Sequence, residues 1–336
     1  MNVLSLFDGM SCGQIALKEL NIHIDTYYAS EIDKFAIKQT QLNFPNTIQV
    51  GDVRKVNVLD LQPIDLLIGG SPCTNLSFAG TRKGLCTKEN IEILSLEQYL
   101  ELKEQGFEFE GQSYLFWEYM RILTEIREYN PNVLFPLENV EMGKKWESVF
   151  NKAIETQGIH INSSLVSAQN RRRIYWTNIN DGNILQPKDR EIFFRHIAEE
   201  EVEEKYYLSE KMMNWLKRHG EKRNTDINIL GDNDKSRCLT ATAQVKGNLV
   251  TDYVCFAPRR TDRKGKTGSC SQNPLPFREI CMSCGHLRRL TPTECARLQT
   301  IPEWYKWQCS NTQQYKMLGN GWTVEVIKHI FGYMIE

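Results

Sequence analysis

The sequence lacks several features that would place it in a class at once. None of its apolar stretches is long enough to span a membrane. Strand-like residues 3–7 stand where a secretory signal would lie, so we expect no signal peptide. With a formal net charge of −1, the 336 residues carry no overall basic field that would indicate a nucleic-acid partner. This length favours one large domain and a smaller one.

The cysteines lack the paired spacing of a common zinc site. Cys281 and Cys284 form a C-x-x-C motif, and Cys255 and Cys270 lie upstream, but there is no matched second pair. A structural zinc ion is the alternative interpretation; we expect no metal. Ten cysteines without a signal peptide fit free thiols in a reducing, cytoplasmic environment.

One cysteine follows directly on an apolar run. Residues 64–68 read Ile-Asp-Leu-Leu-Ile, and residues 69–73 read Gly-Gly-Ser-Pro-Cys. The apolar run predicts a buried strand, and open α/β sheets bind their ligands beyond the carboxyl ends of strands. A lone cysteine is more often a buried structural residue. Here, however, glycine and proline predict a sharp, exposed loop, which suits Cys73 as a thiol nucleophile.

Two further segments bring an acid and arginines to the ends of elements. Residues 134–140 (LFPLENV) are another apolar run and deliver Glu138 at the expected end of a neighbouring strand. In residues 169–176 (QNRRRIYW), an extended backbone would place Gln169, Arg171 and Arg173 on one face. A thiol, an acid and paired arginines at element edges form a candidate active site.

The first fifty residues predict alternating strands and helices. Strands are expected at 3–7, 26–30 and 48–50, with a glycine turn and a helix between the first two. This alternation predicts an α/β fold with a doubly wound parallel sheet. Glu31 ends the second strand, where an acid suits ribose hydroxyls, and Asp52 follows the third, where it would accept a hydrogen bond from an adenine amino group. The alternative for both is a solvated acid.

Local signals predict helices elsewhere in the chain. Residues 89–110 are acidic with interspersed leucines, which predicts a helix with one apolar side in peripheral packing, because acid repels phosphate. Thr291 has the properties of an N-cap, with proline at the first helical position and Glu294 completing a capping box. A last helix is expected at 324–331.

Together these motifs resemble the cytosine-C5 DNA methyltransferase family. The type is bacterial or phage, since no regulatory domain precedes the catalytic segment, and residues 4–20 are closest to the animal de novo methyltransferases. The resemblance implies a Rossmann-like sheet that binds S-adenosylmethionine, and double-stranded DNA as substrate. The matching segments follow the family's order: 7–13, Pro72-Cys73, 113–118, Glu138-Asn139-Val140, 169–176, 288–299 and 317–322.

The resemblance implies a role for each matching residue. Cys73 would attack C6 of a flipped-out cytosine, and Glu138 would assist at N3. Arg173 would contact the cytosine O2, while Arg171 would hold the active-site loop and a nearby phosphate. The loop at 75–84 would close over the base as a lid. The residues implied in cofactor binding are Phe7, Asp8, Gly9, Gly13, Glu31, Ile32, Asp52, Val53, Pro72, Leu115 and Asn320.

The resemblance also divides the chain. Residues 1–178 and 286–336 would form the catalytic domain, and residues 179–285 a target-recognition domain whose basic segment 259–266 reads phosphates or bases. We expect a monomer without membrane contact, in the cytoplasm of a bacterium or a phage-infected cell. A cognate restriction endonuclease, if there is one, would be encoded separately.

Two departures from the family pattern leave alternatives open. Pro136 lies inside the expected central strand, where proline cannot donate to a ladder, so either the sheet tolerates it or Glu138 is displaced. Gly321-Trp322 stands where bacterial members commonly have two small residues. One alternative is a tRNA methyltransferase of the same fold, whose Cys-Phe-Thr signature the recognition region lacks. The other is a weakly catalytic DNA-binding protein, which only Pro136 supports.

Overall fold

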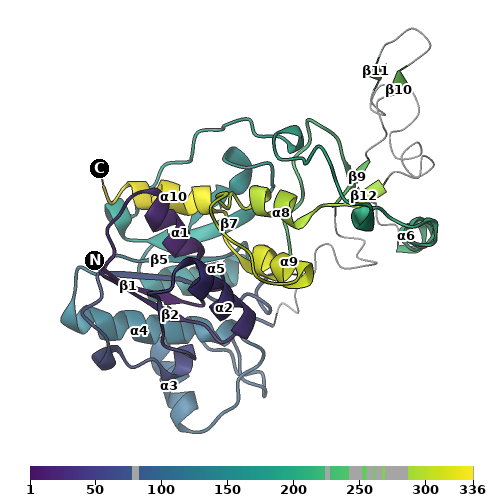
Figure 1. The fold of residues 1–336 in the computed structure, drawn as a ribbon. Coiled ribbons are helices and arrows are strands. Elements are labelled where there is room, and N and C mark those ends of the chain that lie inside the picture. Colours follow the sequence, from purple (N-terminus) through teal and green to yellow (C-terminus); the bar gives the residue numbers. More distant parts are fainter. Residues whose placement is uncertain are drawn as a thin grey trace.

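The computed structural model describes residues 1–77, 83–223, 228–241, 252–255, 260–261, 267–268 and 287–335. Figure 1 shows a large α/β body, which holds both chain termini, and a smaller group of elements extending from one end. The middle of the expected lid, most of the basic segment 259–266, and the motif of Cys281 and Cys284 lie outside the described residues.

A seven-stranded sheet forms the centre of the large body, in the order β3-β2-β1-β4-β5-β7-β6. Its strands are β1 (Asn2–Leu6), β2 (Thr26–Ser30), β3 (Ile48–Gln49), β4 (Leu66–Gly70), β5 (Pro136–Val140), β6 (Ile159–Asn162) and β7 (Arg172–Thr177). The predicted doubly wound α/β sheet is confirmed, with one difference: β7 runs antiparallel to both of its neighbours. The loop from β6 to β7 is too short for the helical crossover that a parallel neighbour requires.

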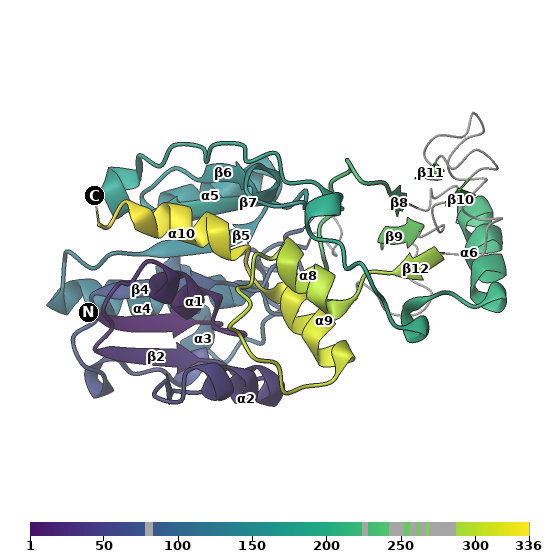
Figure 2. The same cartoon turned by 45° about the horizontal axis from the view of Figure 1, so that its top comes forward.

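Helices cover both faces of this sheet, as Figure 2 shows. The helices α1 (Cys12–Glu19), α2 (Lys34–Asn43) and α10 (Val324–Gly332) cover one face, and α3 (Leu96–Glu104), α4 (Phe116–Tyr129) and α5 (Lys144–Ile154) cover the other. Because both faces are covered, the central strands are apolar at successive positions, and Leu66, Leu67 and Ile68 of β4 are fully buried. In the described part of the chain, no helix has the length and apolar character needed to cross a membrane.

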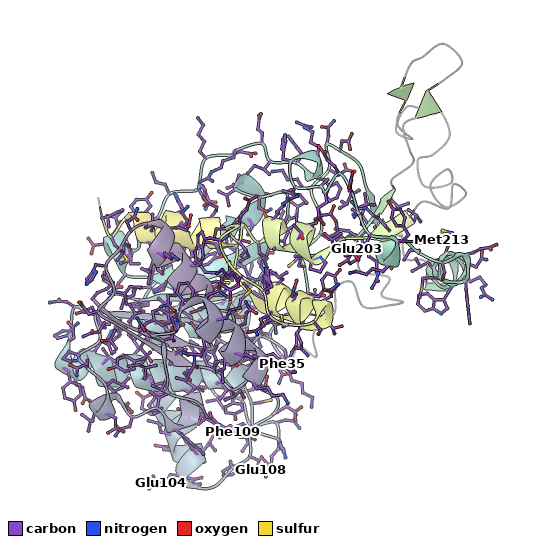
Figure 3. All side chains as sticks on the ribbon, in the orientation of Figure 1. Phe35, Glu104, Glu108, Phe109, Glu203 and Met213 are labelled. Carbon is purple, nitrogen blue, oxygen red and sulfur yellow. The ribbon has the colours of Figure 1, made fainter. Side chains whose placement is uncertain are left out.

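The acidic helix α3 is peripheral, as its composition predicts. Tyr99 and Leu102 are buried against α4, whereas Leu100 stays exposed, so the apolar side is narrower than expected. In Figure 3, Glu104 and Glu108 lie at the edge of the large body, far from Met213 in the smaller group.

The smaller group contains α6 (Glu210–Arg223) and a sheet of β8 (Asn228–Leu230), β9 (Asp252–Cys255) and β12 (Leu287–Arg289). A separate antiparallel pair joins β10 (Arg260–Thr261) to β11 (Thr267–Gly268). The chain returns to the large body through α8 (Pro292–Leu298) and α9 (Asn311–Asn320). The capping box of α8 is confirmed: Thr291 Oγ1 accepts from Glu294 N at 3.1 Å, and Glu294 Oε2 accepts from Thr291 N at 2.9 Å.

Pro136 is the first residue of β5, a position that proline tolerates. In the ladder between β4 and β5, Leu66 pairs with Leu134 and Gly69 with Leu137, and the pairing is interrupted between these two positions. Since the amide of Leu134 faces β4 and alternate residues point the same way, the missing amide of Pro136 would also face β4. The sheet therefore loses one bond, and Glu138 still pairs in register with Gly70.

Candidate active site

The loop after β4 carries Cys73 to the carboxyl end of the sheet. The Cys73 carbonyl accepts hydrogen bonds from the amides of Leu76 and Ser77, both at 3.0 Å, which closes a tight turn. Asn139 at the end of β5 holds the start of this loop, because its Nδ2 donates to the carbonyl and Oγ of Ser71 at 3.1 and 2.9 Å. The thiol is thus presented by a loop that two adjacent strands fix.

Glu138 lies beside this loop, one strand away. Its Oε1 is 2.8 Å from Arg173 Nε, and its Oε2 accepts from Trp322 Nε1 at 3.1 Å. Burial, followed by the charge of Glu138, raises the pKa of the Cys73 thiol, and Arg173 and Arg171 offset part of this effect. The thiol of Cys73, the carboxylate of Glu138 and the guanidinium of Arg173 therefore interact electrostatically.

The two arginines face the same side but have different surroundings. Arg171 is buried, and its guanidinium donates to the carbonyls of Leu239 at 2.9 Å and Gly321 at 2.7 Å. This burial does not fit the expected contact of Arg171 with a DNA phosphate; Arg171 instead ties together loops that border the site. Both arginines contact the Cys238 sulfur and, although burial opposes it, lower the pKa of that thiol.

The acids expected to hold a nucleoside lie at the ends of β2 and β3. Glu31 accepts hydrogen bonds from the amides of Gly9 and Asp33, both at 2.8 Å, and of Ile32 at 2.7 Å, which fixes its carboxylate. Asp52 is bound by Arg54, whose Nε lies 3.0 Å from both carboxylate oxygens and lowers the Asp52 pKa. The sequence predicts a contact of Asp52 with an adenine amino group but not its partner Arg54.

Asp8 occupies the turn between β1 and α1. Its Oδ1 accepts from Tyr27 Oη at 2.9 Å and Ser11 Oγ at 3.2 Å, while its buried Oδ2 lacks a hydrogen-bond partner in the described structure. Burial raises the pKa of this carboxyl from its ordinary 3.8 to about 6. Asp8 therefore carries its full negative charge only well above pH 6.

One cavity of about 790 Å³ connects all these groups, a volume typical of small-molecule sites. All four residues predicted to be catalytic border it, namely Cys73, Glu138, Arg171 and Arg173. All eleven residues predicted to bind the cofactor border it as well, namely Phe7, Asp8, Gly9, Gly13, Glu31, Ile32, Asp52, Val53, Pro72, Leu115 and Asn320.

The lining of the cavity fits S-adenosylmethionine. Ile32 exposes 67% of its surface at the rim, next to the fixed carboxylate of Glu31. An exposed apolar side chain beside an acceptor suits an adenine ring and its ribose hydroxyls. The carboxyl of Asp8, which also borders the cavity, suits a cationic ligand group.

Three lining or neighbouring residues were not assigned a role from the sequence. Trp322 and Arg54 border the cavity, and Cys238 contacts its arginines. Trp322 stands out in the sequence as an indole where bacterial members have a small residue, but the sequence predicts no role for it. Arg54 follows Asp52 by two positions, which is a usable local signal, whereas nothing in the sequence marks Cys238.

Comparisons with known proteins identify the family. The model of the C-5 cytosine-specific DNA methylases matches residues 1–336. The type II methyltransferase M.Bsp6I of Bacillus sp. (strain RFL6) is 26% identical, with 98% of this chain and 97% of the relative covered. M.HpaII of Haemophilus parainfluenzae is 28% identical, with 97% and 86% covered.

Solved structures share the fold. The Dnmt2 methyltransferase of S. pombe aligns with a TM-score of 0.70 at 18% identity and covers 100% of this chain and 98% of its own. A mutant of Spodoptera frugiperda DNMT2 aligns with a TM-score of 0.66 at 21% identity, covering 100% and 99%. With the family model matching from end to end, this chain belongs to the C-5 cytosine-specific DNA methylases, which transfer a methyl group from S-adenosylmethionine to cytosine in DNA.

Proposed function

We propose that Cys73, Glu138 and Arg173 carry out cytosine methylation by this enzyme. The observation that carries the proposal is their convergence in one cavity with the predicted cofactor residues. C6 of cytosine is hidden in a duplex, so the base must be flipped out to reach such a cavity.

The chemistry begins at Cys73. Its thiolate adds to C6, the C5–C6 double bond opens, and its electron pair makes C5 nucleophilic. Glu138, in its protonated form, donates to N3, and Arg173 donates to O2. Both stabilise the negative charge that develops on the ring, and N3 returns its proton to Glu138 when the ring is restored. Bound S-adenosylmethionine supplies the methyl group as an electrophilic sulfonium. A base then removes the C5 proton, the double bond forms again, and the thiolate leaves.

The same cavity supports the predicted cofactor residues. The cofactor residues named above, among them Asp8, Glu31 and Ile32, would bind S-adenosylmethionine.

Residues 179–285 would recognise the DNA target, and residues 1–178 with 286–336 would form the catalytic domain. The type II names of the relatives support a role in restriction-modification with a separately encoded endonuclease. We infer a monomer that acts in the cytoplasm, where bacterial or phage DNA lies.

Nucleoside mass spectrometry tests the proposed function. The protein is incubated with S-adenosylmethionine and, separately, with unmethylated duplex DNA of broad sequence content and with unmodified tRNA. We expect 5-methylcytosine in the DNA alone, and its loss in Cys73→Ser with DNA binding retained. Cys309→Ser, a thiol outside the cavity lining, is the control and should stay active. Product in tRNA alone, or full activity of Cys73→Ser, would contradict the proposal.

A further inference from the structure

Trp322 lies against the carboxylate on which the proposed chemistry depends. Its Nε1 donates to Glu138 Oε2 at 3.1 Å, while Arg173 Nε lies 2.8 Å from Oε1. The two donors come from different elements, since Arg173 lies on β7 and Trp322 lies between α9 and α10. The terminal torsion of a glutamate is soft, so one donor leaves the carboxylate plane free to turn and two donors fix it.

Gly70 provides the space that the indole occupies. It pairs directly with Glu138, so a side chain there would lie beside the carboxylate. A Cβ on Gly70 would lie 2.8 Å from Trp322 Nε1, 3.0 Å from Trp322 Cζ2 and 3.2 Å from Glu138 Oε2. Gly70 is not among the residues with positive φ, so its backbone does not demand glycine. The indole is what requires a glycine at this position.

The segment that carries Trp322 is itself held in place. Arg171 and Gln299 donate to the Gly321 carbonyl at 2.7 and 3.1 Å. Thr323, which is buried, donates through Oγ1 to Gln299 Oε1 at 2.9 Å. Hydrogen bonds on both sides of Trp322 therefore fix its backbone, and the indole is presented to Glu138 from a rigid base.

We propose that Trp322 is a positioning residue of the methylation reaction: its indole N–H, in the space that Gly70 leaves, orients the Glu138 carboxylate toward the target cytosine. The inference rests on the proposed role of Glu138. Each carboxylate oxygen has two lone pairs and accepts one of the contacts described. The second lone pair can accept from the amino group of cytosine or carry the proton that is donated to N3. Trp322 thus acts through Glu138 rather than on the substrate.

Trp322→Phe removes the donor and keeps an aromatic ring. Loss of a hydrogen bond to a charged group predicts a kcat about 10- to 100-fold lower. KM for DNA and for S-adenosylmethionine should change less than about threefold, because Glu138 acts in the transition state. Trp304→Phe is the matched control: Trp304 Nε1 donates to Glu19 Oε1 at 2.7 Å, outside the cavity lining, so this variant should keep wild-type kinetics.

Double variants separate positioning from general destabilisation. In a Glu138→Gln background, Trp322→Phe should cost less than about twofold further in kcat, because the carboxylate that the indole orients has gone. Gly70→Ala should lower activity by crowding the indole, and it should cost little once Trp322→Leu has removed that indole. Thermal denaturation of each variant confirms that it is folded.

The outcomes are distinct. A raised KM for S-adenosylmethionine at unchanged kcat in Trp322→Phe would make Trp322 a cofactor contact and overturn the inference. The inference would also be overturned if Trp322→Phe lowered kcat by the same factor in the Glu138→Gln background as in the wild type. Wild-type kcat in Glu138→Gln would remove the proposed role of Glu138 and the inference with it, whereas activity lost in Glu138→Gln and kept in Trp322→Phe overturns the inference alone.

Discussion

The buried carboxyl of Asp8 makes the stability of the fold depend on pH. Its pKa rises from 3.8 to about 6 on folding, so between these values the folded state binds more protons than the unfolded state. The free energy of unfolding is therefore highest below about pH 4, where Asp8 is protonated, and this contribution is lost as the pH rises through 6. At about 1.36 kcal/mol for each pKa unit, the full change is about 3 kcal/mol.

Asp8→Asn removes this titration. The free energy of unfolding of the variant, relative to wild type, should rise by about 2 kcal/mol between pH 4.5 and pH 7.5, since the remainder of the change falls below pH 4.5. Urea denaturation across this range measures the difference, and Asp60→Asn, which removes an exposed charge, controls for a general charge effect. A difference between Asp8→Asn and wild type that stays constant with pH would refute the reasoning.

Three further changes test other parts of the structure. Arg288→Met leaves Glu294 without its fully buried partner at 2.7 Å and should cost about 3–5 kcal/mol in urea denaturation; a loss under about 1 kcal/mol would contradict this. The ring of Phe150 stacks on Phe116 in the core, with 3.7 Å between the ring centroids. Phe150→Ala should therefore also lower the free energy of unfolding by about 3–5 kcal/mol, and a loss under about 1 kcal/mol would show that the core closes the cavity. Glu31→Gln replaces an acceptor of backbone amides and should weaken S-adenosylmethionine about tenfold by calorimetry with DNA affinity unchanged; equal losses for both ligands would argue against a ribose contact.

The positions of Cys73 and Glu138 could be predicted because each follows an apolar run. Parallel strands bring such ends to one edge of the sheet, and the register places Glu138 opposite Gly70, three residues before Cys73. The place of Glu31 in the cavity lining could be predicted by the same rule, and the capping box of α8 by local spacing alone.

Contacts between segments far apart in the chain could not be predicted from the sequence. Trp322 meets Glu138 across 184 positions, and only the packing of the last helices onto the sheet brings them together. The antiparallel direction of β7 was missed, although the short connection from β6 favours it. For Pro136 the sequence leaves two outcomes open, and the structure agrees with a sheet that tolerates it: the ladder loses one bond two residues before Glu138, and the carboxylate keeps both of its partners.

The proposed chemistry requires Cys73 to bond covalently to C6 of the target base. Duplex DNA carrying 5-fluorocytosine traps this bond. After methyl transfer, C5 carries fluorine in place of the proton that a base would remove, so the thiolate cannot leave. Incubation with S-adenosylmethionine, digestion and peptide mass spectrometry locate the adduct. We expect it on the peptide that contains Cys73 and expect none in Cys73→Ser. An adduct on another cysteine, or methylated DNA without any adduct, would contradict the account.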